Sequence, residues 1–403
     1  MSLQDVIKKK APVIIGINSG TSADGVDLAA LQFSSSPKKQ KISLLAGHSV
    51  KYPSRLKTLI LKTAAADRIS LEELIYLDNI LGMFYGRAAA GFIKRLEKHG
   101  VKISAVASHG QTIRHSPRLV KYEGYTIRGT LQLGSLEYIA ALTEKITVGD
   151  FRQADIALGR EGAPITTAAM ARLFADPVES RLLVNIGGIS NFFYFPARGK
   201  TSMSLKAADC GPGNSLIDLL AFRLFGEKYD RNGHRAQKGN ISQRLISLLL
   251  THPFFKARRQ STGREEFGFQ TADRIIDFGK RLNLDGHDLL ATATEFTVIS
   301  IVQKIKPLLK AEPKIKKLYL TGGGERNTFL KARLRQHLPE CKISSVRQLG
   351  FNPAMVEAAA YAVLGLSCLR GERLRTDFMR RKASKRQPVS GKIVQPPGKL
   401  QDG

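Results

Sequence analysis

Hydrophobic residues along the chain fall into two kinds of pattern, short continuous runs and longer runs with helical spacing. The short runs, several of them rich in β-branched residues, predict β-strands; they cover residues 13–17, 26–33, 102–107, 146–148, 182–186, 192–195 and 317–320. Apolar residues spaced three and four apart predict helices; these cover residues 71–99, 216–225, 241–250, 289–309 and 354–369. Because strands alternate with helices, the pattern indicates an α/β fold.

One arrangement of strands occurs twice. An apolar strand at 13–17 runs into a loop of small and polar residues and returns through 26–33, which predicts a β-hairpin. The same order is found at 182–195, where the loop centres on Gly187 and Gly188. The repetition predicts two related halves, and no long proline- or serine-rich linker separates them. We therefore expect two α/β domains, residues 1–150 and residues 151–403.

Length and composition support a large globular protein with a basic surface. The 403 residues are about 2.7 times a 150-residue domain, and 43% of them are hydrophobic. The 63 Lys and Arg residues exceed the 34 Asp and Glu residues by 29, a net charge that attracts anions in general. Nucleic-acid binding usually concentrates basic residues on one face, whereas here they are distributed, with the densest cluster at 370–386. A nucleic-acid partner is therefore not expected.

Cysteine and apolar content exclude several classes of protein. Cys210, Cys341 and Cys368 have no metal-ligand spacing, which argues against a disulfide scaffold or a zinc finger. No uncharged apolar run approaches the roughly 18 residues of a membrane span. Lys8 to Lys10 precede an apolar run that is too short for a signal peptide and has no plausible cleavage site. We expect a cytoplasmic protein of enzyme size.

The loop of the first hairpin has the composition of a phosphate site. Glycines allow close backbone approach and small hydroxyls add donors without bulk, although the Gly-Lys-Ser/Thr ending of a Walker A loop is missing. Its two carboxylates repel phosphate, so their sensible role is to hold Mg²⁺ between phosphate and protein. The alternative is an ordinary turn rich in Asp and Gly. The loop and the start of the next strand comprise Gly20, Thr21, Ser22, Ala23, Asp24, Gly25, Val26 and Asp27.

Two more glycine-bearing segments stand where strands give way to helices. Asp209 to Asn214 suits close backbone approach to a ligand, with an anion at the following helix N-terminus; a Gly-Pro turn capped by Asn214 is equally compatible. Gly322, Gly323 and Gly324 remove side-chain obstruction where a flat ring such as adenine could lie, whereas a plain βα turn rarely needs three glycines.

Polar residues also follow two other predicted strands. Asp150 ends the strand at 146–148, a position where α/β proteins place chemistry, and Arg152 could orient a carboxylate or contact a phosphate. A structural Asp–Arg pair would explain both residues equally well. His109, in the Ser108 to Thr112 segment, is either a base or a structural histidine, and the second role is the commoner one.

These segments together resemble the anhydro-N-acetylmuramic acid kinase family, which they match in order from residue 16 to about residue 360. The resemblance implies two similar α/β domains of the actin/sugar-kinase/Hsp70 ATPase type, with ATP and substrate in the cleft between them. It also implies a reaction in which ATP and water open the 1,6-anhydro bridge of anhydro-N-acetylmuramic acid, giving N-acetylmuramic acid 6-phosphate in cell-wall recycling. The matching stretches are 16–27, 108–112, 149–152 with Asp155, 162–164, 185–191, 209–214, 261–265, 322–324 with Asn327, and Glu357 with Ala358.

The resemblance also implies roles for individual residues. Asp150 corresponds to the catalytic base, and burial should raise its pKa from about 3.9 toward a useful range. Residues 20–27 match the ATP-phosphate loop, with Mg²⁺ expected at Asp24 and Asp27. The remaining nucleotide site would be lined by Gly187, Gly188 and the glycines at 322–324. The sugar would be bound by Ser108, His109, Gln111, Arg152, Asp209 and Gly211.

Two positions depart from the family pattern. The family usually has Met where Asn18 stands, and its Gly-Gly-Gln-Gly-Ala-Pro segment is Gly-Arg-Glu-Gly-Ala-Pro here. Arg160 and Glu161 would put bulk and charge where the sugar is expected. This keeps open a kinase for another amino sugar and a non-catalytic protein that binds nucleotides or cell-wall fragments. Whether the chain acts alone or as a homodimer is also open.

Overall fold

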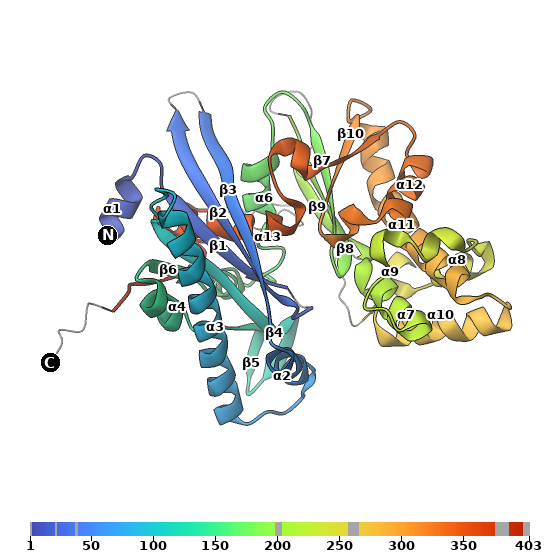
Figure 1. The fold of residues 1–403 in the computed structure, drawn as a ribbon, viewed down its shortest axis with the longest axis horizontal. Helices are drawn as coiled ribbons and strands as arrows, with labels where there is room; N and C mark the ends of the chain where they lie inside the picture. Colours follow the sequence, from blue (N-terminus) through green and yellow to red (C-terminus); the bar gives the residue numbers. More distant parts are fainter. Residues whose placement is uncertain are drawn as a thin grey trace. The chain divides into compact units, whose positions relative to one another are not determined.

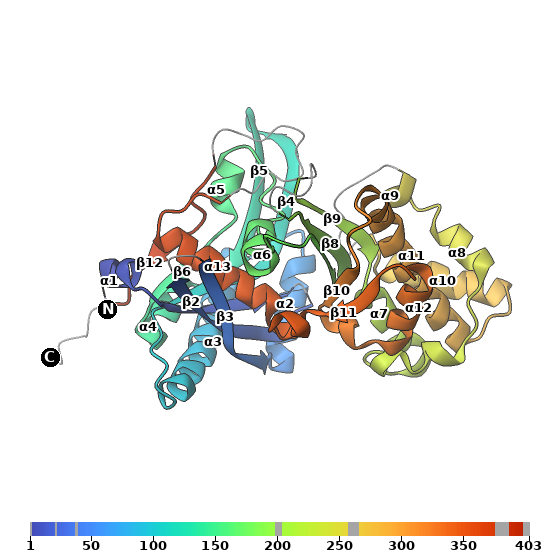
Figure 2. The same ribbon diagram turned by 90° about the horizontal axis from the view of Figure 1, so that it is seen from above.

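The computed structural model describes residues 2–20, 22–36, 39–197, 204–256, 266–374 and 387–397. The chain forms two compact units (Figures 1 and 2). Unit 1 combines residues 1–173 with residues 355–403, and unit 2 is the continuous stretch 174–354.

Unit 1 is built on a large mixed sheet. Its strands are β1 (Val13–Ser19), β2 (Gly25–Ser36), β3 (Lys39–Lys51), β4 (Ala105–Tyr122), β5 (Tyr125–Leu133), β6 (Ile146–Gly149) and β12 (Lys392–Val394). Its helices are α1 (Leu3–Lys8), α2 (Ser54–Ala65), α3 (Leu71–Glu97), α4 (Leu136–Thr143), α5 (Gln153–Ala157), α6 (Thr167–Phe174) and α13 (Val356–Leu369).

Unit 2 has a smaller sheet and more helix. Its strands are β7 (Arg181–Ile186), β8 (Ile189–Phe195), β9 (Lys206–Pro212), β10 (Lys317–Thr321) and β11 (Lys342–Ser345). Its α-helices are α7 (Asn214–Phe225), α8 (Gln243–Leu249), α9 (Pro253–Lys256), α10 (Phe269–Arg281), α11 (Gly286–Ala311) and α12 (Thr328–His337). Short 3₁₀ turns are η1 (Arg231–Gly233), η2 (Ala236–Lys238), η3 (Gly323–Arg326), η4 (Val346–Leu349) and η5 (Pro353–Met355).

The two sheets share one topology. In unit 1 the order β3-β2-β1-β4-β6 joins an antiparallel meander of the first three strands to β4 and β6, which run parallel to β1. In unit 2 the order β9-β8-β7-β10-β11 repeats this arrangement, with β10 and β11 parallel to β7. The predicted pair of related α/β halves is thus confirmed. Unit 1 adds β5 on β4 and β12 on β6.

The division of the chain differs from a boundary at residue 150, because the C-terminal segment returns to unit 1. Helix α13 packs on β1, β2 and β4, and β12 pairs antiparallel with β6. Figure 2 shows this red helix among the blue strands that come from the opposite end of the sequence. The approach is close: a Cβ on Gly16 of β1 would overlap the Ala358 carbonyl of α13. Helices α5 and most of α6 also belong to unit 1.

Burial explains the continuous apolar runs. Every residue of β1 is buried, because Val13, Ile15 and Ile17 share a core with α3 while Gly16 faces α13. In unit 2, Leu182 and Val184 of β7 share a core with α11 and α12. Strands covered on both faces lack the alternation of a half-buried strand. The long helix α3 begins where the Ser70 side chain accepts from the Glu73 amide.

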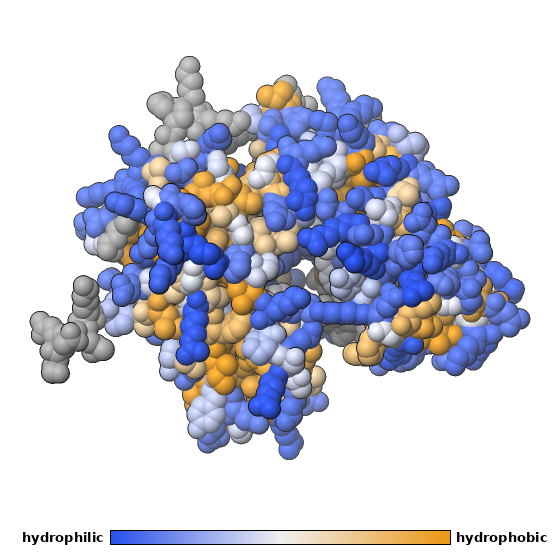
Figure 3. Space-filling model, in the orientation of Figure 1, coloured by the Kyte–Doolittle hydropathy of each residue, from blue (hydrophilic) through white to orange (hydrophobic). Residues whose placement is uncertain are grey.

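The surface of each unit is mostly polar on the face shown in Figure 3, with scattered hydrophobic patches. Exposed large hydrophobic side chains include Leu71, Ile75 and Tyr76 on α3. Within the ranges given above, no helix combines the length and the apolar content needed to cross a membrane. The densest basic cluster lies largely at 375–386, outside the described residues.

Candidate active site

The first glycine loop is a tight turn at the carboxyl end of β1. The Ala23 amide donates to the Gly20 carbonyl at 3.0 Å, and Ala23 has a left-handed φ of 48°. Gly25 lies against β3, where a Cβ would overlap the Val50 carbonyl. Around Gly20 the nearest atom to an added Cβ is Ser22 Oγ at 3.8 Å, so there is room beside its α-carbon. Thr21 lies outside the described residues.

Buried polar side chains form hydrogen bonds at the base of this loop. Ser19 Oγ donates to Gln111 Oε1 at 2.5 Å, and Gln111 Nε2 donates to the Gly20 carbonyl at 3.4 Å. Ser19 Oγ also forms a hydrogen bond with the Tyr52 hydroxyl. Burial raises the pKa of Tyr52 to about 12. Gln111, predicted to bind sugar, is only 1% exposed. Its side chain is committed to holding the loop.

The two predicted metal ligands have different surroundings. The Asp24 carboxylate is exposed and pairs with Lys57 Nζ at 2.6 Å. Asp27 is more buried, which raises its pKa, and it accepts a hydrogen bond from Ser49 Oγ. A carboxylate that is costly to bury and has spare lone pairs fits a cation, whereas one neutralised by lysine fits less well. Asp27 is therefore the better candidate for Mg²⁺.

Glu357, which the sequence placed in a motif without a role, belongs to this end of the sheet. Asn18 is the register partner of Asp27 in the β1–β2 pair, and its amide donates to Glu357 Oε2 at 2.8 Å. Glu357 is exposed at the start of α13. The residue type at position 18 thus orients a carboxylate beside the loop.

Asp150 occupies a strained position at the end of β6. Its φ of 54° is in the left-handed region, which a non-glycine residue adopts at a cost. Its Oδ2 lies 2.6 Å from Nζ of Lys392, which β12 places opposite Gly149. The side chain is 23% exposed, so the carboxylate is partly accessible from solvent.

Arg152 is held by His109 and a neighbouring loop. Its Nε donates to His109 Nε2 at 3.1 Å and its Nη1 donates to the Gly162 carbonyl at 2.7 Å. His109 Nδ1 lies 2.9 Å from the Gly110 carbonyl, an arrangement that suits the neutral ring. Burial, together with the Arg152 charge, lowers the pKa of His109 to about 3. His109 therefore positions Arg152, and the ring is further packed on Tyr361 at 4.6 Å.

The strand predicted at 102–107 extends further than expected, because β4 continues through Ser108 and His109 to Tyr122. Gly110 carries a left-handed φ of 74° inside the strand, and β5 pairs with β4 from Gln111 onward. Ser108 is fully buried, and its Oγ accepts from the Gly110 amide at 3.3 Å.

The expectation that Arg160 projects into the sugar site is wrong. Its side chain is 3% exposed, and its Nη1 lies 3.2 Å from both Asp155 Oδ1 and Gln387 Oε1. Asp155 also accepts from the Gly162 amide at 2.9 Å. A buried charge requires such partners, and Arg160 finds them inside unit 1. Glu161 is exposed.

In unit 2 the predicted glycine segments converge on the first turn of α7. The Asn214 and Ser215 amides donate to the Gly187 and Gly188 carbonyls at 2.8 and 3.1 Å. These amides are therefore not free for an anion. Asn214 Nδ2 donates to the Ile186 carbonyl at 2.9 Å.

The three glycines at 322–324 lie against the same turn. A Cβ on Gly322 would contact Asn185 Oδ1 at 2.5 Å, and one on Gly323 would lie 3.2 Å from Asn214 Nδ2. The Gly322 φ of 79° also requires glycine. The structure therefore brings together the unit 2 residues that the sequence assigned to the nucleotide.

Asp209 lies on the edge strand β9, opposite Asn191 of β8. Burial lowers the pKa of Lys304 on α11, and the negative charge of Asp209 partly opposes that shift. Asn191 Oδ1 is buried and has no hydrogen-bond partner in the part of the chain that is described. Gly211 has a φ of 133° and lies close to Ser300 of α11.

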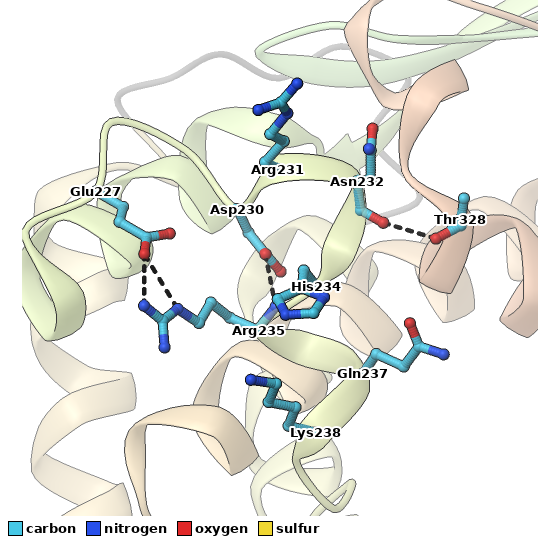
Figure 4. Close-up of a pocket in the computed structure, with 9 residues that line it drawn as sticks. All are labelled: Glu227, Asp230, Arg231, Asn232, His234, Arg235, Gln237, Lys238 and Thr328. Atoms are coloured by element: carbon cyan, nitrogen blue, oxygen red, sulfur yellow. Dashed lines mark hydrogen bonds and ion pairs between the residues drawn. The ribbon is translucent and has the colours of Figure 1, made fainter.

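A separate cavity of about 580 Å³ lies in unit 2 beside the start of α12. Figure 4 shows Glu227 turned toward Arg235 and the Asn232 carbonyl toward Thr328, whose hydroxyl donates to it at 2.8 Å. None of the residues predicted for the site lines it; its lining is Glu227, Asp230, Arg231, Asn232, His234, Arg235, Gln237, Lys238 and Thr328. No cluster of three or more His, Cys, Asp or Glu side chains suited to a metal ion is found within the described ranges.

Comparison with known proteins identifies the family. Anhydro-N-acetylmuramic acid kinase of Trichormus variabilis is 38% identical over 356 residues, covering 87% of this chain and 89% of that protein. The enzyme of that name from Caldanaerobacter subterraneus is 32% identical, covering 91% and 93%. Among solved structures, component A of the Acidaminococcus fermentans (R)-2-hydroxyglutaryl-CoA dehydratase matches 89% of this chain and 99% of that one, at 11% identity and a TM-score of 0.42. The family model described as anhydro-N-acetylmuramic acid kinase matches residues 12–393, and the chain belongs to that family.

Proposed function

We propose that the protein uses ATP and water to open the 1,6-anhydro ring of anhydro-N-acetylmuramic acid and to phosphorylate O6. The product, N-acetylmuramic acid 6-phosphate, would enter peptidoglycan recycling. Family membership over residues 12–393 supports the reaction. The observation that carries it in the structure is the polar end of the unit 1 sheet, where Asn18 pairs in register with Asp27 and Gln111 holds the carbonyl of Gly20, two residues further on.

The phosphate part of the reaction would use the first loop. Phosphoryl transfer depends mainly on positioning and charge neutralisation. The backbone at Gly20 would approach the phosphates, and Asp27 would hold Mg²⁺, which neutralises phosphate charge when bound. Asp24, already paired with Lys57, would keep the loop folded. Gly187, Gly188 and the glycines at 322–324 would line the rest of the nucleotide site.

The sugar part requires a carboxylate base. Water adds to C1, the C1–O6 bond breaks, O6 takes the γ-phosphoryl group, and ADP leaves; the proton lost by water goes to the base. Asp150 is the proposed base, and Lys392 holds its carboxylate in one orientation. Arg152, positioned by His109, would contact the sugar. Gln111 and Ser108 would act indirectly, since both are buried.

Glu357 is a second candidate for the base. It is an exposed carboxylate oriented by Asn18 beside the phosphate loop. By contrast, Asp150 has one oxygen in an ion pair with Lys392.

Asp209, with its charge close to Lys304, is proposed to bind the sugar.

Three matched variants separate these carboxylates. Asp150→Asn is expected to lower kcat at least 100-fold while ATP binding changes little, because a general base contributes roughly 10²–10⁴-fold. If Glu357→Gln abolishes turnover while Asp150→Asn stays active, the base is Glu357. Asp209→Asn should raise KM for the sugar more than it lowers kcat.

The activity itself is tested by ADP release with Mg²⁺–ATP in the presence and absence of the anhydro sugar. Sugar-dependent ADP release together with a 6-phospho sugar would support the proposal, and ADP release indifferent to the sugar would reject it. Binding without turnover would instead favour the non-catalytic alternative. The buried position of Arg160 weakens the case for a different amino sugar, which now rests on the exposed Glu161. Cytoplasmic location and a homodimer stay predictions.

A further inference from the structure

Strand β5 carries a row of polar side chains on one face. Arg128, Thr130 and Gln132 alternate along the strand, so their side chains point to the same side. Gln132 Nε2 donates to Thr130 Oγ1 at 2.7 Å, and Thr130 Oγ1 lies 3.1 Å from His115 Nδ1. This face is buried at Thr130 and partly buried at Arg128 and Gln132, and buried strand faces usually carry apolar residues. This row therefore needs a separate explanation.

Two members of the row hold polar atoms that nothing in the described part of the chain satisfies. Nε and Nη1 of Arg128 are buried without an acceptor, and Oε1 of Gln132 is buried without a donor. A buried polar group without a hydrogen-bond partner lowers the stability of the folded state, and a charged group lowers it most. The unmet requirement is for an acceptor of negative charge at Arg128 and a donor at Gln132.

The row adjoins the proposed sugar site rather than the phosphate loop. Helix α5, which follows Arg152, packs on β5, and Gln153 Nε2 donates to the Thr130 carbonyl at 3.0 Å. Burial and the Arg152 charge lower the pKa of His115 to about 4, so His115 adds no charge at neutral pH.

The end of the β4–β5 pair that lies beside the phosphate loop contains Gln111, which donates to the Gly20 carbonyl and pairs in register with Leu133. Arg128 is five residues from Leu133 along the strand, roughly 16 Å at the backbone. An anion at Arg128 is thus distant from the ATP phosphates.

We propose that Arg128 binds the carboxylate of the substrate's lactyl group and that Gln132 accepts from an amide N–H or hydroxyl of the same sugar. This rests on the proposed function and adds its selectivity: the row distinguishes an acidic anhydro amino sugar from a neutral one. Arg128 is thereby a specificity-determining residue, and it takes no part in bond breaking.

The test compares anhydro-N-acetylmuramic acid with 1,6-anhydro-N-acetylglucosamine, which lacks the lactyl carboxylate. In Arg128→Gln, kcat/KM for the acidic sugar should fall about 100-fold, as for loss of one partner of a buried charge pair. Values for the neutral sugar should stay within a few-fold of the unmodified protein. Arg118→Gln is the matched control, since Arg118 is an exposed residue of the same hairpin, and should change neither. Equal losses on both sugars, or no loss, would overturn the proposal.

Calorimetric binding of both sugars without ATP keeps this test independent of turnover. If the protein releases no ADP but prefers the acidic sugar, and the preference is lost in Arg128→Gln, the proposed kinase activity is rejected and the Arg128 subsite is retained. If the protein turns over the sugar without that preference, the subsite is rejected and the kinase activity is retained.

Thermal unfolding checks folding of the variants. Arg128→Met should unfold at a higher temperature than the unmodified protein, because two buried N–H groups without acceptors, Nε and Nη1, have been removed. Gln132→Leu should weaken binding of both sugars equally, and selective loss of one would contradict the role given to Gln132.

Discussion

The two units share a strand topology, but their first hairpin loops differ in what they offer a ligand. In unit 1 five residues, 20–24, separate β1 from β2, and two carboxylates stand in or beside the turn. In unit 2 only Gly187 and Gly188 separate β7 from β8, and their carbonyls accept from the amides of α7. The first loop therefore presents carboxylates, whereas the second is a two-residue turn whose carbonyls are already hydrogen-bonded. The two hairpins thus share a strand arrangement and differ in the polar groups that their loops present.

The largest effect that tests this contrast is expected at Asp27. Asp27→Asn should lower kcat about 100-fold or more, because it removes the carboxylate proposed to hold Mg²⁺ at the phosphates, and it should raise the Mg²⁺ concentration required. Gly187→Ala is the matched change in unit 2: the nearest atoms to its Cβ lie 3.7 Å away, so only a few-fold change is expected. ADP release across an Mg²⁺ titration measures both. Equal sensitivity of the two loops would break the contrast.

A smaller effect tests whether the C-terminal helix is part of unit 1. Gly16→Ala forces a Cβ onto the Ala358 carbonyl, and such overpacking costs about 1–3 kcal/mol. Denaturant unfolding should show unit 1 weakened and unit 2 unchanged. Gly91→Ala, at a site in α3 with nothing within 4 Å, should stabilise unit 1 by up to about 1 kcal/mol. A shift of the unit 2 transition in Gly16→Ala would argue against the division.

The smallest effect concerns acid stability of unit 1. The pKa of His109 is about 3 in the folded chain and near 6.5 when unfolded, so the unfolded state binds the proton first as pH falls. The His109 contribution is fully present above pH 6.5 and declines by about 1.4 kcal/mol per pH unit toward pH 3. His109→Gln should flatten the dependence between pH 7.5 and pH 5.5 in urea unfolding. An unchanged slope would show that His109 is not buried as a neutral ring.

Local patterns predicted much of this framework and little of its long-range pairing. The two hairpins and the five predicted helices, at 71–99, 216–225, 241–250, 289–309 and 354–369, follow from apolar spacing and are confirmed. Strand β12 could not be predicted, since three residues, Lys392–Val394, become a strand only because β6 is available. Likewise, nothing near Asp150 in sequence indicates Lys392. The sequence predicted an exposed charge at Arg160. Its ion pair with Asp155 forms only because the intervening residues fold back, which the sequence pattern does not indicate.

The return of residues 355–403 to unit 1 has a consequence for synthesis on the ribosome. Unit 2 is continuous and can complete its core once residue 354 has emerged, whereas β1 cannot be covered by α13 until nearly the whole chain has been made. The usual order, in which the N-terminal domain folds first, would then be reversed. Until α13 emerges, the face of β1 that this helix covers would stay exposed, and a ribosome stalled before residue 355 would present chaperones with a complete unit 2 and an incomplete unit 1.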